Sequence, residues 1–600
     1  MRKYLNFDRI NDIINDIYFF VIVNYSGGKM IQKVWKYRNE AVNADMVENA
    51  ARNMNVPKIV AQLLLNRGIS APDFKTFLSK SKQGILNPMT MLDMDKATDR
   101  IIDAINNGEH IAIYGDYDVD GITSTALLYK FLKGLGAKLI YYIPDRKDEG
   151  YGINIMAVNK LIKEGIKLLI TVDCGITAIG EIEFAKLQGM DVIVTDHHTC
   201  KERIPTAAVA VLNPKREDDE YEFDALAGVG VAFKLVLGLA IKLGLDTGKV
   251  FDEYVDLAAI GTIADVVPLI GENRIIVDRG LSALQNPKRC GIKALLDAAG
   301  VSDKKINAGT VAFSLAPRIN AAGRLSTATT AVELLLTDDM QTALRVAAEL
   351  DKANKDRQET EVDIHDEAME MINADKDFNK KSIIVLAKEG WHNGVIGIVC
   401  SKLVEKYHKP CILISIENGV GKGSGRSVGS FNLFDALSEC ESVLTNFGGH
   451  AMAAGMGIDA EKIPEFETKI NEYAKNNLKP EDRVPVVKID SILNGSNLNL
   501  ATSKLLLSLE PFGMGNETPV FAVKDVEIIN VGAVGIDRKH LRMQIIKDGV
   551  RINVIGFGLG EYADELRVGQ KIHIACKLDV NTYQGNETAQ LVLVDIKPIK

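Results

Sequence analysis

Short apolar runs alternate with longer amphipathic stretches between residues 110 and 213. Runs rich in Val, Ile and Leu are typical of strands buried on both faces of a parallel sheet, and the stretches between them have the length and period of helices. The pattern therefore predicts an α/β domain with a doubly wound parallel sheet. The expected strands are His110–Tyr114, Lys138–Pro144, Lys167–Val172, Asp191–Thr195 and Ala207–Asn213, and the expected helices are Thr123–Leu135, Ile155–Glu164, Ile179–Leu187, Phe233–Leu243 and Glu253–Ile263.

The pattern changes twice after this domain. The stretch from Asp338 to Asp375 contains no Gly or Pro and predicts a long helix, of about 50 Å at 1.5 Å per residue. A second α/β segment follows, with strands expected at Ile383–Ala387 and Cys411–Ile416. From Val486 onward the sequence alternates apolar-rich strand segments with turns. Five strands over about a hundred residues fit a small barrel, either an OB-fold or an SH3-like barrel. Its expected strands are Val526–Val534, His540–Lys547, Arg551–Phe557, Lys571–Lys577 and Gln590–Ile596.

These changes of pattern predict the domain boundaries. The expected segments are an N-terminal extension (1–29), a helical segment (30–90), the first α/β domain (91–335), a connecting helix (336–376), the second α/β domain (377–480) and the β-barrel (481–600). In the first segment Gly27-Gly28-Lys29 precedes Met30, as a translated ribosome-binding site would. Met30 is therefore the expected start of the protein.

Composition narrows the class of protein. The chain is 46% hydrophobic and 25% charged, which is ordinary for soluble globular domains. Its net charge of −9 excludes a broadly basic surface, so nucleic-acid binding would need local positive charge or metal ions. The seven cysteines are scattered without a C-x-x-C pair, which favours the reducing cytoplasm over a disulfide scaffold or zinc knuckle. No apolar run reaches the ~20 residues of a membrane span.

A cluster of acids stands at the end of the first expected strand. Asp116, Asp118 and Asp120 follow the apolar run that ends at Tyr114, and Gly121 precedes the next expected helix. Ligands of open α/β sheets bind at such carboxyl ends of strands. Three carboxylates this close would repel one another unless divalent cations neutralise them. The alternative, an acidic loop that only caps the helix, explains one aspartate better than three.

Further acids and two histidines follow other apolar runs. Asp173 ends one expected strand, Asp196-His197-His198 ends another, and Asp265 interrupts a later apolar stretch. Each has a structural alternative: a helix cap for Asp173, strand-end surface for the histidines and a buried ion pair for Asp265. Together they offer one crevice a set of carboxylate and imidazole ligands that suits Mn²⁺ or Mg²⁺. Two such ions ~3.5–4 Å apart are a recurrent device for phosphoester hydrolysis.

The motifs, in this order, resemble those of the DHH phosphoesterase superfamily. The matching segments of the first domain are Asp116–Gly121, Val172–Gly175, Asp196–His198 and Gly261–Asp265. Three downstream segments narrow the resemblance to the RecJ family of single-strand-specific 5′→3′ DNA exonucleases: Ala316–Arg324, Gly423–Ser427 and Gly448–Gly455. The resemblance covers nearly the whole chain after Val47. It implies a DHH catalytic domain, a DHHA1 substrate-binding domain and a C-terminal OB-fold.

The resemblance implies roles for the residues of the first domain. The implied metal ligands are Asp116, Asp118, Asp120, Asp173, His197 and Asp265, with Asp173 bridging the two metals. The implied catalytic residues are Asp173, Asp196 and His198: His198 orients the substrate or stabilises the developing charge, and Asp196 holds the histidine pair. One departure is Tyr114, where many relatives carry histidine. It implies that the first metal lacks an imidazole ligand and binds more weakly.

The downstream motifs imply a phosphate-binding site. Ser424 and Arg426 are expected in a glycine-rich loop, where backbone donors approach an anion and an arginine fork matches a phosphate. The implied substrate-binding residues are Ser424, Arg426, His450, Gly449, Arg318, Asn320, Arg324 and Arg146. Two alternatives stay open: the glycines only form a turn, and Arg318 is a structural ion-pair partner. Candidates on the barrel are Arg538, Lys539, His540, Arg542, Arg551, Phe557 and Tyr583, although barrel aromatics are more often core.

The sequence thus predicts a cytoplasmic two-metal exonuclease that removes nucleotides from the 5′ end of single-stranded DNA in repair and recombination. Its expected cofactors are two divalent cations, Mn²⁺ or Mg²⁺. Its expected partners are single-stranded DNA with a free 5′ end, a single-stranded-DNA-binding protein and a helicase, with no membrane and a monomeric state. One alternative is a phosphodiesterase acting on oligoribonucleotides or cyclic dinucleotides, which the extra barrel disfavours. The other is a non-catalytic scaffold that binds single-stranded DNA, which the intact acids disfavour.

Overall fold

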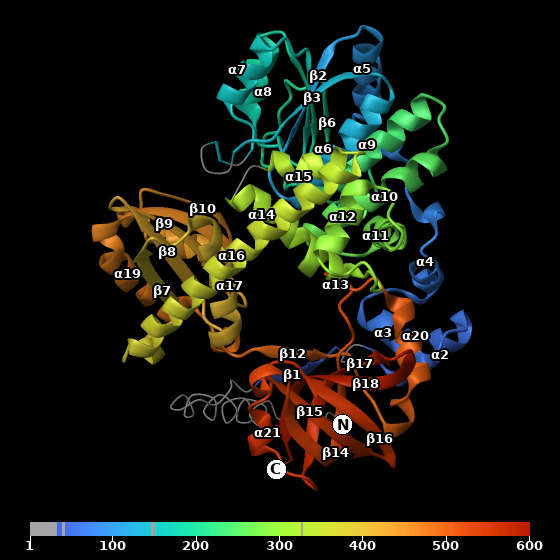
Figure 1. Cartoon of the computed structure of the whole chain (residues 1–600), viewed down its shortest axis with the longest axis vertical. Helices are drawn as coiled ribbons and strands as arrows, with labels where there is room; N and C mark the ends of the chain where they lie inside the picture. The colour runs from blue at the N-terminus through green and yellow to red at the C-terminus, as the bar shows by residue number, and fades with distance from the viewer. Residues whose placement is uncertain (1–32, 39–41, 146–148, 151, 326–327, 600) are drawn as a thin grey trace, which may run out of the picture. The chain divides into compact units, whose positions relative to one another are not determined.

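The computed structural model describes residues 33–38, 42–145, 149–150, 152–325 and 328–599 (Figure 1). The predicted extension at 1–29 and the predicted substrate-binding residue Arg146 lie outside these residues, as does the side chain of Arg324. The chain forms two compact units. Of the described residues, the larger unit comprises those between 42 and 354 and between 490 and 599, and the smaller unit comprises those between 33 and 38 and between 355 and 489.

The larger unit contains a five-stranded parallel sheet in the order β3–β2–β4–β5–β6. Its strands are β2 (His110–Gly115), β3 (Lys138–Tyr142), β4 (Leu168–Val172), β5 (Asp191–Thr195) and β6 (Ala210–Leu212). The predicted parallel sheet is confirmed. The strand order reverses between β2 and β4, and ligand crevices of open α/β sheets form at such a switch point.

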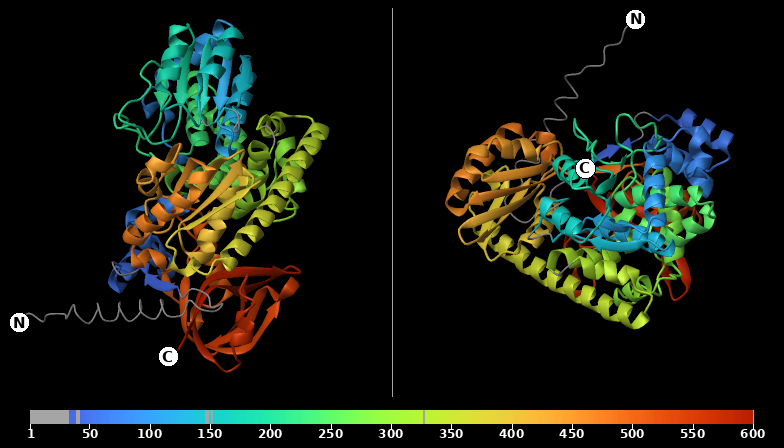
Figure 2. Two further views of the ribbon diagram at one scale, coloured as in Figure 1. Left: turned by 90° about the vertical axis from the view of Figure 1, so that its left-hand side faces the viewer. Right: turned by 90° about the horizontal axis from the view of Figure 1, so that it is seen from above.

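Apolar cores cover both faces of this sheet, because successive side chains of a strand point to opposite sides. Ile111 and Ile113 pack on the side of α5, α6, α9 and α10, whereas Ala112 and Tyr114 pack on the side of α7 and α8. Figures 1 and 2 show these helices on either side of the strands, the doubly wound arrangement that the sequence predicts. The helices are α5 (Met94–Asn106), α6 (Val119–Gly134), α7 (Ile155–Lys163), α8 (Ile179–Leu187), α9 (Gly228–Lys242) and α10 (Thr247–Ala264).

Further helices extend the larger unit. They are α11 (Gly271–Leu284), α12 (Cys290–Ala298), α13 (Ala308–Thr310), α14 (Ala316–Leu325) and α15 (Thr329–Leu336). A π-helix, η5 (Val311–Leu315), joins α13 to α14, where Pro317 lacks the N–H of a regular helical turn. The predicted long helix is confirmed as α16 (Met340–Ala374), about 52 Å at 1.5 Å per residue. Among the described residues, no helix has both the length and the apolarity needed to span a membrane.

A closed β-barrel completes the larger unit. Its strands follow one another in the order β14–β15–β16–β18–β17, and β17 pairs back with β14. All five predicted strands are present, as β14 (Phe521–Val534), β15 (His540–Lys547), β16 (Val550–Gly556), β17 (Lys571–Tyr583) and β18 (Asn586–Pro598). The short β13 (Ser491–Ile492) pairs with β14, and α20 (Leu500–Leu506) and α21 (Tyr562–Glu565) flank the barrel. The helices α2 (Ala44–Met54), α3 (Lys58–Asn66) and α4 (Phe74–Ser79) share one apolar core with it.

The smaller unit contains a five-stranded mixed sheet in the order β10–β11–β9–β8–β7. The strands are β7 (Ile384–Glu389), β8 (Cys411–Glu417), β9 (Val420–Arg426), β10 (Asn446–His450) and β11 (Ala453–Asp459). The helices are α17 (Asn393–Tyr407), α18 (Leu433–Ser438) and α19 (Ile463–Asn477). A separate parallel pair joins β1 (Val34–Tyr37) to β12 (Val486–Ile489).

Strand β9 corrects the predicted glycine-rich loop. The segment is the central strand of the sheet, hydrogen-bonded to β8 on one side and β11 on the other. Its glycines make room for neighbouring side chains: a Cβ on Gly423 would lie 2.8 Å from Met456, and one on Gly425 would lie 2.7 Å from Leu433. The prediction was wrong because glycine here serves close packing rather than a turn.

Candidate active site

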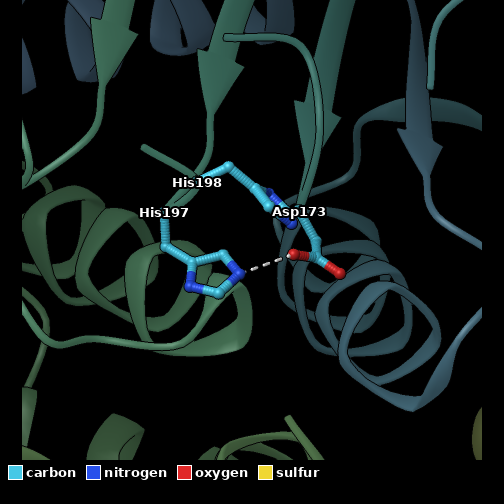
Figure 3. Close-up of side chains that lie close together, drawn as sticks. All are labelled: Asp173, His197 and His198. Carbon is cyan, nitrogen blue, oxygen red and sulfur yellow. Dashed lines mark ion pairs between the residues drawn. The ribbon is translucent and has the colours of Figure 1, made fainter. Parts of the chain in front are cut away.

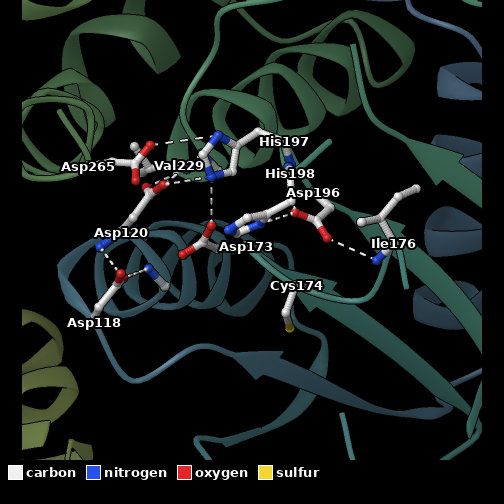
Figure 4. Close-up of polar contacts among 12 residues, drawn as sticks. Asp118, Asp120, Asp173, Cys174, Ile176, Asp196, His197, His198, Val229 and Asp265 are labelled. Carbon is white, nitrogen blue, oxygen red and sulfur yellow. Dashed lines mark hydrogen bonds and ion pairs between the residues drawn. The ribbon is translucent and has the colours of Figure 1, made fainter. Parts of the chain in front are cut away.

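The acidic loop after β2 places Asp118 and Asp120 in different environments (Figure 4). Asp118 caps α6, its Oδ1 accepting hydrogen bonds from the backbone N–H groups of Asp120 (2.9 Å) and Gly121 (3.1 Å). Asp120 is buried, and its oxygens accept from the backbone N–H groups of Gly228 and Val229, both at 2.7 Å. The capping alternative thus holds for Asp118, while the positive end of α9 stabilises the charge of Asp120.

Asp173 lies among the other ligand candidates (Figures 3 and 4). It follows β4 in the left-handed conformation, with φ of 60°, and its side chain is buried. The absence of a side chain at Gly228 leaves the space that Asp173 occupies, because a Cβ on Gly228 would lie 2.6 Å from Asp173 Oδ1. The same glycine therefore donates to Asp120 and makes room for Asp173.

His197 follows β5 and connects three carboxylates (Figure 4). Its Nε2 lies 3.1 Å from Asp173 Oδ1 and 3.8 Å from Asp120 Oδ2. Its Nδ1 lies 3.6 Å from Asp265 Oδ2. One buried imidazole thus reaches the acid that follows β4, the acid in the first turn of α6 and the acid at the end of α10.

Asp196 is a buried anchor for both histidines. Its Oδ1 accepts from the backbone N–H groups of His197 (2.7 Å) and His198 (3.0 Å) and lies 2.7 Å from His198 Nδ1. Its Oδ2 accepts from the backbone N–H of Ile176 at 2.9 Å. With Nδ1 held in this way, the half-exposed ring of His198 is fixed in orientation.

Asp265 joins the cluster from the C-terminal end of α10. The next residue, Val266, is exposed and adopts the left-handed conformation, with φ of 62°. This conformation costs a β-branched residue on the order of 1–3 kcal/mol. The turn after α10 therefore holds Asp265 in place under strain.

Burial and repulsion shift the protonation of these groups. Burial and the charges of Asp265 and Asp118 raise the pKa of Asp120 well above its usual value, and burial with the charges of Asp120 and Asp118 does the same for the pKa of Asp173. Burial and Asp118 raise the pKa of Asp265 to about 7. Burial lowers the pKa of His197 to about 3, so this ring is neutral. Carboxylates that resist ionisation beside a neutral imidazole form a site that a cation would stabilise.

The donor set fits divalent metal ions. Ligand atoms lie within 4.8 Å of one another in three groups: Asp116, Asp118 and Asp173; Asp120, His197 and Asp265; Asp173, His197 and His198. The structure therefore brings all six predicted ligands together. Within the described part of the chain, Asp173 Oδ1 and both ring nitrogens of His197 are buried and form no hydrogen bond, although Nε2 lies 3.1 Å from that oxygen. Buried polar atoms rarely remain unpaired, so these atoms are the ones that a metal would bind.

Tyr114 lies at the position where the resemblance departs from the histidine of many relatives. Its ring is buried and stacks on Tyr142, with ring centroids 5.3 Å apart. Its hydroxyl donates to the carbonyl of Gly152 at 2.9 Å. Weaker binding of the first metal at a site without imidazole stays a prediction.

The predicted phosphate-binding residues of the smaller unit lie on one face of its sheet. His450 of β10 is opposite Ala453 of β11, which is opposite Arg426 of β9, and Gly455 is opposite Ser424 in the neighbouring row. Residues two apart in a strand share a face, so the two rows point to the same side. Arg426 NH1 donates to Ser424 Oγ at 3.3 Å. Gly449, with φ of 138°, precedes His450.

The N-terminal part of α17 is a component that the sequence analysis missed. His392 is its N-cap residue, and Gly397 lies against Ser424 and Arg426, two of the predicted phosphate-binding residues. A Cβ on Gly397 would lie 2.8 Å from Ser424 Oγ and 3.2 Å from Arg426 NH2. Helix N-termini attract anions. The available signal was the His-Asn-Gly turn between an expected strand and an apolar helical stretch.

The predicted substrate-binding residues on α14 lie in different surroundings. Arg318 donates to Asp351 at 2.9 Å, in the ion pair that was its structural alternative. Asn320 is half-buried. A Cβ on Gly323 would lie 2.8 Å from the carbonyl oxygen of Tyr117, so α14 borders the acidic loop. Substrate binding by Arg318 and Asn320 stays a prediction.

The aromatic candidates of the barrel are not core residues. Phe557 and Tyr583 are 63% and 69% exposed, and His540 packs on Phe557 with ring centroids 5.5 Å apart. Arg538 forms an exposed ion pair with Asp564 at 3.1 Å. The remaining basic candidates Lys539, Arg542 and Arg551 are exposed as well. These side chains are accessible to a ligand on the barrel surface.

Comparison with known proteins gives three matching family profiles. They are the DHH family, N-terminal domain, at residues 110–262, the DHHA1 domain at 380–476 and the RecJ OB domain at 489–595. The single-stranded-DNA-specific exonuclease RecJ of Bacillus subtilis is 40% identical over 569 residues, which cover 94% of this chain and 71% of the relative. RecJ of Haemophilus influenzae is 36% identical over 541 residues, which cover 87% of this chain and 93% of the relative.

Solved structures agree with these matches. The crystal structure of RecJ from Thermus thermophilus in complex with Mn²⁺ superposes with a TM-score of 0.79 at 31% identity, covering 93% of this chain and 78% of that chain. The Mg²⁺ complex of the same protein gives a TM-score of 0.74 at 30% identity, covering 93% of this chain and 77% of that chain. The matches confirm the predicted DHH and DHHA1 domains, and they favour the OB-fold over the SH3-like alternative for the barrel.

Proposed function

The chain belongs to the RecJ family of single-stranded-DNA-specific exonucleases, and from this membership we propose that it degrades DNA strands from their 5′ ends. It is a metal-dependent exonuclease specific for single-stranded DNA, with Mn²⁺ or Mg²⁺ as cofactors. The observation that carries the proposal is the overlap of three groups of possible metal ligands: one group contains both Asp173 and His197, and each of the other two contains one of them. Overlapping groups of this kind suit two neighbouring ions that act on one phosphodiester.

Asp116, Asp118, Asp120, Asp173, His197 and Asp265 would hold these ions. Bound divalent ions supply a nucleophile at neutral pH and stabilise the charge of the leaving 3′-oxygen. The protein orients the ligands through its backbone: the N-terminus of α9 fixes both oxygens of Asp120, and the first turn of α6 fixes Asp118. Asp173 can contribute to the ligand group that contains His197 and to the group that contains Asp116, because Gly228 leaves room for its side chain.

We assign His198 to the substrate, as a donor to the scissile phosphate. The Asp196 carboxylate lies 2.7 Å from its Nδ1 and fixes the orientation of the ring, so Nε2, on the opposite side, is the nitrogen that would donate to the substrate. Burial opposes the charged ring, but the hydrogen bond and charge of Asp196 raise the pKa of His198 above its usual value. The ring therefore carries its proton to a higher pH than a free histidine.

Asp196→Asn is expected to lower exonuclease activity about 10–100-fold, the usual effect of losing a residue that orients a catalytic or metal-binding group. The pKa of His198 falls in the variant, so its proton is lost at a lower pH and the basic limb of the kcat–pH profile moves to lower pH. Asp191→Asn, at the opposite end of β5 from Asp196, is the matched control and should leave the profile in place. An unmoved basic limb in Asp196→Asn would contradict the assignment.

We assign the 5′-terminal phosphate to Ser424, Arg426 and His450. They share one face of the smaller unit's sheet, and the N-terminal part of α17 borders two of them. A guanidinium fork, a hydroxyl and a helix N-terminus together match the geometry and charge of a terminal phosphate. Recognition of a terminal phosphate would set the polarity of degradation.

Arg426→Ala is expected to raise KM for a 5′-phosphorylated strand about 10–100-fold, because a charge-assisted hydrogen bond contributes roughly 1.5–3 kcal/mol. The same variant should change KM for a 5′-hydroxyl strand much less. Steady-state rates on the two oligonucleotides measure the difference. Lys469→Ala removes a positive charge from α19 and is the control, since α19 packs on the opposite face of the sheet. Equal losses on both strands would contradict a terminal-phosphate site.

Digestion of long single strands labelled at one end tests the proposed function. With Mn²⁺ or Mg²⁺, a 5′ label should be released first, and a duplex of the same sequence should persist. Early release of a 3′ label would refute the polarity. Release of label from dinucleotides but not from long strands would favour the small-substrate phosphodiesterase, and strand binding without metal-dependent cleavage would favour the scaffold.

We further propose that the protein acts in the cytoplasm as a monomer, in DNA repair and recombination. Its seven cysteines are free in the structure, as is usual in a reducing compartment. A helicase and a single-stranded-DNA-binding protein are the proposed partners, because a single-strand-specific enzyme depends on strands that have been opened and kept apart.

A further inference from the structure

Three consecutive polar residues are buried in the first turn of α11. Glu272, Asn273 and Arg274 are each no more than 2% exposed. Charged and amide side chains are rarely buried so completely unless they are hydrogen-bonded. Each of the three is bonded to a different part of the larger unit, so this turn is an anchoring point.

Asn273 is bonded to two backbone loops. Its Nδ2 donates to the carbonyl oxygens of Ala225 (2.5 Å) and Pro268 (3.1 Å). Both neighbours are acceptors, so the amide nitrogen rather than the amide oxygen must face them. The two loops are 43 residues apart in sequence and have this one side chain in common.

Each of these loops leads directly to a metal-ligating group. Ala225 precedes Gly228 and Val229, whose N–H groups hold both oxygens of Asp120. Pro268 follows the strained turn that begins at Asp265. Asp120 and Asp265 belong to the same group of ligand atoms around His197.

The neighbouring residues keep the anchor itself in place. Glu272 accepts from the hydroxyl of Tyr221 (2.5 Å), from Lys234 Nζ (2.6 Å) and from the backbone N–H of Leu86 (2.9 Å). Arg274 stacks on the ring of Phe77, 3.8 Å from its centroid. It also donates to the carbonyl oxygens of Leu509 (3.0 Å) and Glu510 (2.8 Å). With both flanks bonded in this way, the Asn273 amide has a fixed position.

We propose that Asn273 is a positioning residue of the metal site, whose single amide sets the separation of Asp120 and Asp265. The proposal rests on the proposed function, in which these two aspartates are metal ligands. Asn273 does not touch the metal or the substrate. It acts by holding the loop before α9 and the turn after α10 at one distance, and so tunes the affinity for the cation that the two aspartates share with His197.

The test is a titration of the full-length protein with Mn²⁺, in which the electron paramagnetic resonance signal of free Mn²⁺ reports binding without DNA. Asn273→Asp keeps the side-chain volume but turns an acceptor toward both carbonyls. It is expected to weaken one Mn²⁺ site about 10–100-fold, as is typical for a residue that orients a ligand, and to leave the other site nearer to wild type. Asn273→Ser keeps one donor and should lie in between. If Asn273→Asp does not fold, the Mn²⁺ affinity of Asn273→Ser tests the proposal.

Ile574→Ala is the matched control for loss of stability alone. Ile574 is fully buried in the barrel core of the same unit and contacts neither loop. This variant should lower the melting temperature and leave both Mn²⁺ affinities unchanged. Folded Asn273 variants that bind Mn²⁺ at both sites with wild-type affinity would overturn the proposal. Absence of Mn²⁺ binding by the wild-type protein would instead overturn the ligand assignment itself.

Discussion

Asp173→Asn is expected to lower exonuclease activity more than about 10³-fold, beyond the loss typical of a single transition-state donor. Asp173 contributes to two of the three ligand groups, and its Oδ1 lies 3.1 Å from His197 Nε2. An amide nitrogen in place of one oxygen cannot bind a cation, so a side chain that would contribute to both proposed metal sites could serve only one of them. Single-turnover release of a 5′ label in excess Mn²⁺ measures the effect independently of substrate binding.

The same substitution should stabilise the metal-free protein. Burial and the charges of Asp120 and Asp118 raise the pKa of Asp173, so its ionised form is unfavourable in the folded state. An uncharged asparagine avoids that cost at neutral pH, and the melting temperature in EDTA should rise. Strand binding in EDTA should be unchanged. An inactive variant that melted lower than the wild type would indicate misfolding instead of a lost ligand.

Hydrophobic periodicity was sufficient to predict the sheet and its ligand-bearing edge. Buried parallel strands such as β2 and β4 are short apolar runs, and the residue after each run must lie at the carboxyl edge. Asp116 and Asp173 could therefore be placed near one another although 57 positions separate them. The long α16 was equally predictable, since its sequence lacks every helix breaker.

The parts that escaped prediction depend on contacts between distant segments. Gly228 and Val229 hold Asp120 from the start of α9, and no local pattern marks a glycine that makes room for a carboxylate. Asn273 carries no charge and lies inside an ordinary helical stretch, so only its two carbonyl partners reveal a role. In β9 the glycine-rich sequence wrongly indicated a loop, because here the glycines make room for side chains packed against the sheet instead of forming a turn.

Metal-free protein should lose stability as the pH rises from about 4 to about 7, and divalent metal should restore it. Burial and Asp118 raise the pKa of Asp265 to about 7, so between its unfolded pKa and this value the folded state binds more protons than the unfolded state. Stability from this group is complete below the unfolded pKa and is lost as pH rises through the folded pKa, by on the order of 4 kcal/mol.

Other carboxylates that form salt bridges in the folded state gain stability as pH rises, in the opposite direction. The effect of Asp265 is therefore measured as the difference between the wild type and Asp265→Asn. In EDTA, urea unfolding at pH 5 and pH 8 should show a larger loss for the wild type than for this variant. Mn²⁺ at 100 times its dissociation constant should then stabilise the wild type at pH 8 by about 2.7 kcal/mol for each site. The same Mn²⁺ concentration should stabilise the variant less, because the carboxylate that releases its proton is also a ligand. Equal stabilisation of both proteins would mean that Asp265 faces the cluster without binding the ion.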